Sequence, residues 1–449
     1  YADLAALADV PGLRRARLPT LATSKSRGER VSETLDEIFR DGDWLDAGID
    51  GRRVRVAVVD VGFQGAAALD GAELGPWLTI EDDADGGAAH GTAVAEVVHD
   101  VAPGARLSLH AFRTDVEFLS LVEQLADARV DVVNGSIGFD NVWPADGSSP
   151  FTRAVDRLEA SGALWVGAAG NEGGRYLAGP VAPGVLGAWT LNGEAGAWLP
   201  TDDGRVEARL RWSEPMGAAA VDLDLVAQDE DGTVCGRADD PQDGDDDPLE
   251  ELLAECAGAW AWVSLSAPAG EVPDDLVAWL YAPDGLDPAS TAAGLGTLTL
   301  PADTRRGLAV GACSRVRGTA PSYSSIGPTE DGRTKPDLCT GDGVTTATYG
   351  ERGFFGTSAT APHVAGFAAL IMHGERLRGE PAGTRDRILA STVDLGDPGA
   401  DDAFGQGALD AGPAPEGCHC ATAPAQGGFS AALGLLLVAF GRRRRAPAE

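Results

Sequence analysis

Short valine-rich runs that alternate with helical patterns are the feature that most constrains how this chain folds. The run at residues 54–59 is typical of a buried parallel strand and ends at Asp60. Similar runs follow at residues 107–112, 130–134, 163–167 and 308–311, with helical patterns between them at residues 90–100, 116–128 and 151–161. This alternation predicts an α/β domain with a doubly wound, mostly parallel sheet. Such folds place their sites at the carboxyl ends of the strands, which is where Asp60 stands.

The pattern changes between residues 176 and 304. Helical periodicity stops, turns rich in Gly, Asp and Pro become frequent, and short alternating runs occur at residues 206–212, 221–227, 259–265 and 276–280. We therefore expect an all-β sandwich inserted in the α/β domain. In the second of these runs Asp222 and Asp224 alternate with apolar residues, so their carboxylates are expected on the solvent-exposed face.

These changes divide the chain into six predicted segments. They are a lead-in at 1–45, the first part of the α/β domain at 46–175, the sandwich at 176–304, the second part at 305–410, a linker rich in Pro, Ala and Gly at 411–426, and a C-terminal segment at 427–449. Within the last segment, residues 427–441 are apolar and four arginines follow directly. The apolar stretch is shorter than the roughly 20 residues that span a bilayer. Its basic end favours contact with a membrane or a sorting machinery over a buried core helix.

Charge and cysteine content restrict the partners and the compartment. The 449 residues carry a net charge of −34, which excludes nucleic acid and anionic membrane surfaces as partners of the folded body. Six cysteines show no zinc-type spacing. Their order suggests the pairs Cys235–Cys256 and Cys313–Cys339, which would imply an oxidising compartment. Free buried cysteines are the alternative.

A serine, a histidine and an aspartate occupy positions suited to nucleophilic catalysis. Ser358 lies between a glycine turn and a predicted buried helix at residues 361–373, where free N–H groups and the helix dipole favour negative charge. A serine hydroxyl needs a base to take its proton, and that imidazole needs a carboxylate to orient it. His90 at a predicted helix start and Asp60 at a strand end provide these groups.

A fourth polar residue follows another predicted strand. Asn171 comes shortly after the strand at residues 163–167, so its amide also lies at a carboxyl end. Together with the backbone N–H of Ser358, this amide could hold a tetrahedral oxyanion. One such donor contributes about 3–4 kcal/mol to lowering a barrier.

Four ordered stretches resemble the signature segments of the subtilisin-like serine proteases, the subtilases of peptidase family S8. They are VAVVDVG at 56–62, HGTAVAEVV at 90–98, AAGNEG at 168–173 and GTSATAPHVAG at 356–366. The resemblance implies the catalytic triad Asp60, His90 and Ser358, with Asn171 as the oxyanion donor. It further implies that an extended substrate pairs with Ser136, Ile137 and Gly138, and that Ala168, Ala169 and Gly170 form a wall of the specificity pocket.

The resemblance also carries expectations for neighbouring residues and for processing. It makes His363 a packing residue rather than the base. Val61 replaces the usual Ser or Thr after the aspartate, and Ala359 replaces the usual Met after the serine. The start of the chain, up to about residue 30, would be the end of a propeptide. Cys418-His419-Cys420, the apolar segment and the arginines resemble the Myxo-type sorting signals of Gram-negative bacteria, which implies secretion or display at the cell surface.

No cofactor is expected, with calcium as the alternative. The acidic stretch at residues 239–251 contains six Asp and two Glu, but their crowding lacks the spacing of a known calcium loop and favours a solvated acidic loop. We thus predict a monomeric serine endopeptidase that acts on proteins or peptides. The alternative is an inactive subtilase-fold surface protein that binds partners through the sandwich. A narrower enzymatic alternative is a processing protease whose groove is restricted by the insertion.

Overall fold

The computed structural model describes residues 30–42, 44–81, 88–184, 189–267, 272–287 and 295–415. Most of the predicted propeptide remnant, Cys418 to Cys420 and the C-terminal segment 427–449 lie outside these ranges. The predictions of processing, sorting and membrane engagement therefore stay predictions. Within the described ranges, no helix combines the length and the apolar character needed to cross a bilayer.

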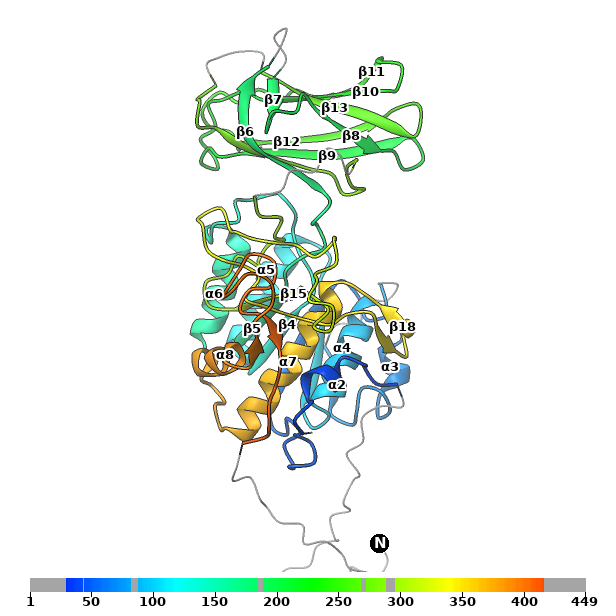
Figure 1. Cartoon of the computed structure of the whole chain (residues 1–449), viewed down its shortest axis with the longest axis vertical. Helices are drawn as coiled ribbons and strands as arrows, with labels where there is room; N and C mark the ends of the chain where they lie inside the picture. Colours follow the sequence, from blue (N-terminus) through cyan, green and yellow to red (C-terminus); the bar gives the residue numbers. More distant parts are fainter. Residues whose placement is uncertain are drawn as a thin grey trace, which may run out of the picture. The chain divides into compact units, whose positions relative to one another are not determined.

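A nine-stranded sheet forms the centre of the α/β part (Figure 1). Its order is β19-β20-β16-β15-β5-β4-β1-β3-β2, and all neighbours pair in parallel except β19 and β20. The strands are β1 Arg55–Asp60, β2 Leu78–Ile80, β3 Arg106–Ala111, β4 Val132–Gly135, β5 Leu164–Ala168, β15 Leu308–Ala312, β16 Leu338–Thr340, β19 Thr392–Val393 and β20 Ala408–Leu409. The prediction of a mostly parallel sheet is confirmed.

Alternate residues of the central strands pack against two different groups of helices. Val56 and Val58 of β1 belong to one apolar core with α4 and α7, whereas Ala57 and Val59 belong to a second core with α5 and α6. Because successive side chains of a strand point to opposite faces, these two cores lie on the two sides of the sheet. The helices are α4 His90–Val101, α5 Asp115–Ala128, α6 Pro150–Ala160, α7 Thr357–Gly374 and α8 Pro381–Leu389, with single turns α2 Leu35–Ile38 and α3 Ala66–Leu69.

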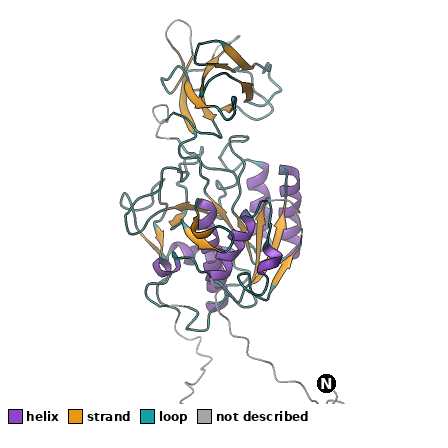
Figure 2. Ribbon diagram, turned by 90° about the vertical axis from the view of Figure 1, so that its right-hand side faces the viewer, coloured by secondary structure: helices purple, strands orange, loops and turns teal. Residues whose placement is uncertain are grey.

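The described residues between Tyr176 and Tyr281 form two antiparallel sheets, coloured green in Figure 1. Figure 2 shows that the described residues here are strands and loops, while the helices accompany the large sheet. One sheet has the order β11-β10-β13-β8 and the other β12-β9-β14-β6-β7. Their strands are β6 Tyr176–Pro183, β7 Trp189–Leu191, β8 Ala197–Pro200, β9 Arg205–Trp212, β10 Asp224–Gln228, β11 Val234–Ala238, β12 Leu249–Glu255, β13 Trp260–Ser266 and β14 Val277–Tyr281. Both sheets contribute to one apolar core that includes Leu210, Leu225 and Val263.

Asp224 departs from its predicted place on the solvent-exposed face. Its side chain is buried and accepts the hydroxyl hydrogen of Ser266 at 2.9 Å. β10 also begins at Asp224, three residues later than the predicted start at residue 221. The partner strand β13 supplies the hydroxyl that makes this burial tolerable, and the periodicity of one strand contains no information about that partner.

Both predicted cysteine pairs are disulfides. Cys235–Cys256 lies in the antiparallel sheets, and Cys313–Cys339 connects the end of β15 to β16 in the large sheet. Cys313 and Cys339 are both buried. The second disulfide therefore joins two neighbouring parallel strands after the chain has returned from the antiparallel sheets.

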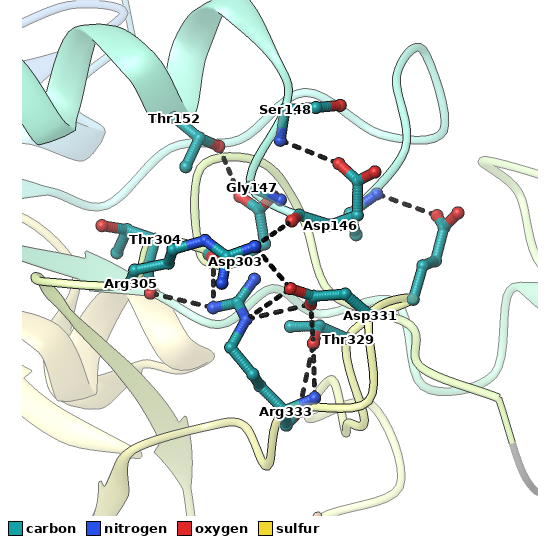
Figure 3. Close-up of polar contacts among 12 residues, drawn as sticks. Asp146, Gly147, Ser148, Thr152, Asp303, Thr304, Arg305, Thr329, Asp331 and Arg333 are labelled. Atoms are coloured by element: carbon teal, nitrogen blue, oxygen red, sulfur yellow. Dashed lines mark hydrogen bonds and ion pairs between the residues drawn. The ribbon is translucent and has the colours of Figure 1, made fainter. Parts of the chain in front are cut away.

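A polar network connects the chain before the antiparallel sheets with the chain after them (Figure 3). The fully buried carboxylate of Asp303 accepts the N–H of Gly147 at 2.7 Å and the hydroxyl hydrogen of Thr152, at the start of α6, at 2.5 Å. Arg333 donates to the carbonyl of Asp303 at 2.7 Å and to the carboxylate of Asp331 at 2.9 Å. Arg305 connects Asp331 to the carbonyl of Asp146. Segments some 150 residues apart in sequence are thus joined by buried and half-buried charges.

A short hairpin precedes α7. Its strands are β17 Val344–Thr346 and β18 Gly350–Phe354. The buried carboxylate of Glu96 on α4 accepts the backbone N–H groups of Ala347 and Thr348 in the turn. These hydrogen bonds therefore attach the hairpin to α4, the helix that begins with His90.

Removal of the disulfide in the large sheet tests how much it stabilises the fold. We expect the double variant Cys313→Ala/Cys339→Ala to lose about 2–4 kcal/mol of unfolding free energy, because the unfolded chain regains the freedom of the closed loop. Urea unfolding followed by tryptophan fluorescence measures this loss. The matched variant Cys235→Ala/Cys256→Ala, with a similar loop, should lose a comparable amount. An unchanged midpoint for both variants would contradict the stabilising role.

Candidate active site

The four predicted catalytic positions lie at strand ends or helix starts. Asp60 is the last residue of β1, and His90 is the first residue of α4. Asn171 follows the end of β5, and Ser358 is the second residue of α7. This helix begins at Thr357 rather than at the predicted residue 361, so Ser358 lies inside its first turn.

Asp60 and His90 form a closely bonded pair. The Nδ1 atom of His90 lies 2.8 Å from Oδ2 and 3.0 Å from Oδ1 of Asp60. The carboxylate is fully buried, and the N–H of Val61 also donates to Oδ1 at 2.8 Å. Gly91 permits this approach, because a Cβ there would come within 2.7 Å of the Asp60 Cβ and 2.5 Å of the Phe63 ring. The carboxylate thus holds a proton on Nδ1 and leaves Nε2 as the basic nitrogen.

The electrostatic balance at His90 favours its protonated form. Burial by itself lowers the pKa of His90, but the hydrogen bond and the negative charge of Asp60 outweigh it and raise the pKa above 6.5. The ring is one quarter exposed and meets Phe354 edge-on, with 5.6 Å between centroids. Phe354 is the last residue of β18 and precedes Ser358 closely in the chain. Its ring therefore connects His90 to the segment that leads to Ser358.

Ser358 bonds to Ser136, in the predicted substrate-binding segment, rather than to His90. Its hydroxyl donates to the carbonyl of Ser136 at 3.3 Å, and the Ser136 hydroxyl donates to the carbonyl of Ser358 at 3.1 Å. Among the described residues, no hydrogen bond joins Ser358 to His90. The structure therefore contains the Asp60–His90 pair and the Ser136–Ser358 pair as separate units.

Asn171 lies directly beside the start of α7. Its Oδ1 accepts the N–H of Thr357 at 2.8 Å and the Thr357 hydroxyl hydrogen at 3.2 Å. Within the described part of the chain, neither the Nδ2 group nor the N–H of Ser358 donates to a protein acceptor. Gly356 has φ 95°, and a Cβ there would lie 3.0 Å from Nδ2. Two free donors thus stand next to the serine.

The two predicted substrate-binding segments differ in how much of their backbone is free. In the first, Ser136 is buried and Gly138 is exposed; in the described ranges, the backbones of Ile137 and Gly138 form no hydrogen bond. A free, exposed backbone is what pairing with an extended peptide requires. The backbone of the second segment, Ala168 to Gly170, is hydrogen-bonded to neighbouring segments: Ala169 pairs with Val310 and Thr299, and Gly170 with Ser325 and Thr357. It can act as a wall but offers few backbone partners.

Thr357 is a site residue that the sequence analysis did not single out. Its fully buried hydroxyl donates to Asn171 and accepts the N–H of Gly170 at 3.2 Å. One side chain therefore fixes Asn171, the predicted oxyanion donor, and the predicted pocket wall to the helix of Ser358. The stretch Gly356-Thr357-Ser358 was visible in the sequence, but the partners of its threonine were not.

His363 lies in the interior of α7 and is fully buried. Its Nε2 atom lies 2.7 Å from the Ser32 hydroxyl, and its Nδ1 atom lies 2.8 Å from the carbonyl of Ala359. Burial lowers the pKa of His363 to about 4. It is a neutral side chain that packs the N-terminal segment against α7.

The acidic stretch gathers three exposed carboxylates, but nothing in it distinguishes a metal site. Atoms of Asp243, Asp245 and Asp246 lie within 4.8 Å of one another. Exposed acidic groups often cluster without an ion. A cavity of about 770 Å³ occurs elsewhere, lined by Trp143, Arg211 and other residues but by none of the four candidate catalytic residues.

Comparisons with known proteins agree with this architecture. Residues 287–407 match the model of the Subtilase family (Peptidase S8). The matched segment contains Ser358, whereas Asp60, His90 and Asn171 lie outside it. No curated protein matches the sequence.

Solved structures resemble the chain at low sequence identity. The CspB protease of Clostridium perfringens is 16% identical, with a TM-score of 0.57 over 82% of this chain and 95% of that chain. A lanthipeptide protease is 16% identical with a TM-score of 0.46 over 84% of this chain and 92% of that chain. A Pseudoalteromonas arctica protease is 15% identical with a TM-score of 0.46 over 86% and 98%. The first likeness establishes the fold, and the other two are too distant to add to it.

The Asp60–His90 pair makes a testable prediction about titration. In Asp60→Asn the pKa of His90 should fall below 6.5, because the bond to a charge is lost while burial remains. Histidine ring signals in an NMR titration between pH 5 and 9 measure this shift. His363, with its pKa near 4, should not titrate in either protein and serves as the internal control. A His90 pKa that is unchanged in Asp60→Asn would contradict the described pairing.

Proposed function

We propose that this protein is a serine endopeptidase that uses Ser358 as nucleophile and His90, oriented by Asp60, as general base. The observation that carries the proposal is the buried Asp60–His90 pair together with two donors, Asn171 Nδ2 and the Ser358 N–H, that have no acceptor among the described residues and lie at the start of α7. The family match over residues 287–407 and the fold support a peptidase.

The proposed reaction begins when the Ser358 hydroxyl leaves the carbonyl of Ser136 and turns to His90 Nε2. His90 takes the proton while Oγ bonds to the carbonyl carbon of the peptide. Asn171 Nδ2 and the Ser358 N–H then donate to the oxyanion, assisted by the positive end of the α7 dipole. His90 passes the proton to the leaving amine, and water releases the acyl group by the same steps.

The proposed substrate is an extended protein or peptide segment. Its backbone would pair with Ile137 and Gly138, whose own backbone groups have no described partner. Because the pKa of His90 is raised, its neutral, basic form needs a higher pH than that of an ordinary histidine, so we expect activity to rise with pH as His90 loses its proton.

We further propose that the enzyme works outside the reducing cytosol. Two disulfides, one in each part of the described chain, support this location. The net charge of −34 fits a secreted, soluble body and argues against nucleic acid as a partner. Anchoring or sorting by the C-terminal segment remains part of the proposal.

Covalent labelling tests the nucleophile directly. We expect a fluorophosphonate probe to label the wild type at Ser358, and Ser358→Ala to lose both labelling and casein cleavage while its unfolding midpoint stays within a few degrees. Ser161→Ala, at the end of α6 and outside the site, should be labelled like the wild type. A wild type that is neither labelled nor able to cleave casein would instead favour an inactive subtilase-fold binding protein.

Asn171 offers a second test, because its two amide atoms have separate partners. Asn171→Ala should lower kcat by about 10²–10³ with little change in KM, as expected when one oxyanion donor is lost. Asn171→Asp keeps an acceptor for the Thr357 N–H but loses the donor, and it should be equally impaired. Steady-state cleavage of a peptide substrate measures both. Near-normal kcat in Asn171→Asp would show that the Nδ2 donor is not used.

A further inference from the structure

Two segments that leave the candidate site contact the antiparallel sheets. Residues 139–143 continue the substrate-binding segment that ends at Gly138. Residues 172–175 continue from Asn171 and lead into β6. Both segments contact β14, and their contacts place the antiparallel sheets next to the residues that would hold the substrate and the oxyanion.

The first contact is made by Asn141, which is buried and has φ 53°. Its Nδ2 group donates to the carbonyl of Trp279 on β14 at 2.9 Å and to the carbonyl of Arg209 on β9 at 3.1 Å. Arg209 in turn donates to the carbonyl of Asp140 at 3.3 Å. The backbones of two neighbouring strands are thus bonded to the segment that follows Gly138.

The second contact is a polar cluster around Tyr281, the last residue of β14. Its hydroxyl lies 3.2 Å from Oε2 of Glu172 and 3.4 Å from Oδ2 of Asp140. Arg175 donates to the same Oε2 atom at 2.9 Å. Burial raises the pKa of Tyr281 above its ordinary value, so the hydroxyl remains protonated and able to donate. We call these four residues the Tyr281 cluster.

Both the side chain and the backbone of Glu172 are hydrogen-bonded, and these bonds restrict the position of the neighbouring Asn171. Its side chain is bonded to Tyr281 and Arg175, while its backbone N–H donates to the Ser325 hydroxyl at 3.0 Å. Asn171, the preceding residue, is fixed on its other side by Thr357. The direction of the free Nδ2 group therefore depends on an anchor in α7 and an anchor in the antiparallel sheets.

We propose that Tyr281 is a positioning residue for the oxyanion donor. Its bond to Glu172 fixes the position of the preceding residue, Asn171, relative to β14. This inference rests on the proposed function. In this role the antiparallel sheets complete the catalytic geometry, in addition to any effect on which substrates enter. A donor must stand within a few tenths of an ångström of the developing oxyanion, so a looser Glu172 would weaken stabilisation of the transition state and leave substrate binding unchanged.

The test compares two tyrosines of one aromatic cluster. Tyr176 packs on Tyr281, with 5.1 Å between ring centroids, but in the described residues its hydroxyl bonds to neither carboxylate. We expect Tyr281→Phe to lower kcat about tenfold with KM within twofold, a fraction of the effect of losing a whole donor. Tyr176→Phe should keep the kcat of the wild type. Glu172→Gln retains an acceptor for Tyr281 but loses the charge that pairs with Arg175. Its kcat should lie between those of Tyr281→Phe and Tyr176→Phe.

A double-variant cycle separates positioning from general damage. If Tyr281 acts through Asn171, then Tyr281→Phe should change kcat by less than about twofold in an Asn171→Ala background. A full tenfold effect in that background, a raised KM with normal kcat, or equal losses in Tyr281→Phe and Tyr176→Phe would each overturn the inference. Because all these outcomes require an active wild type, they are distinct from failure of the proposed function, in which the wild type itself would not cleave peptide or be labelled.

Discussion

A fully buried carboxylate at Asp60 is the constraint on which the candidate site depends. A charge without solvent needs partners, and here they are the N–H of Val61 and the imidazole of His90. The imidazole can approach only because Gly91 has no side chain, so the start of α4 packs closely against the end of β1. The burial of this carboxylate thus requires close packing of α4 on β1, and its bond to His90 sets the tautomer of the histidine and the direction of its basic nitrogen.

The other half of the site is organised by the start of α7. Its free N–H groups and its dipole favour negative charge, while Thr357 binds Asn171 and the segment at Gly170 to the same turn. Deeper in this helix, His363 is neutral and packs against the N-terminal segment at Ser32. Two histidines in one protein therefore have opposite electrostatics: a neighbouring carboxylate raises the pKa of His90, and burial without one lowers the pKa of His363.

Local patterns predicted the elements well and their partners less well. The valine-rich run before Asp60, the helix that starts at His90 and the strands near residues 206–212 and 276–280 agree with the structure within about one residue. The helix expected from residue 361 begins at Thr357, whose N–H donates to Asn171, a residue distant in sequence. The Asp224 carboxylate was expected in solvent but is buried, and the hydroxyl of Ser266 on another strand donates a hydrogen bond to it. The division into separate domains and the role of the C-terminal segment stay predictions.

The sequence by itself determined the alternation of strands and helices in the α/β part and the identity of the four candidate catalytic positions, and it suggested both disulfide pairs. These follow from periodicity, from nearby cysteines and from short motifs, all of which act over a few residues or a single loop. Only the tertiary structure decided that Ser358 bonds to Ser136 rather than to His90, that Thr357 holds Asn171, and that Tyr281 reaches Glu172. Those contacts join residues more than 100 positions apart, and hydrogen bonds of that kind depend on side-chain directions that exist only after the sheets have packed.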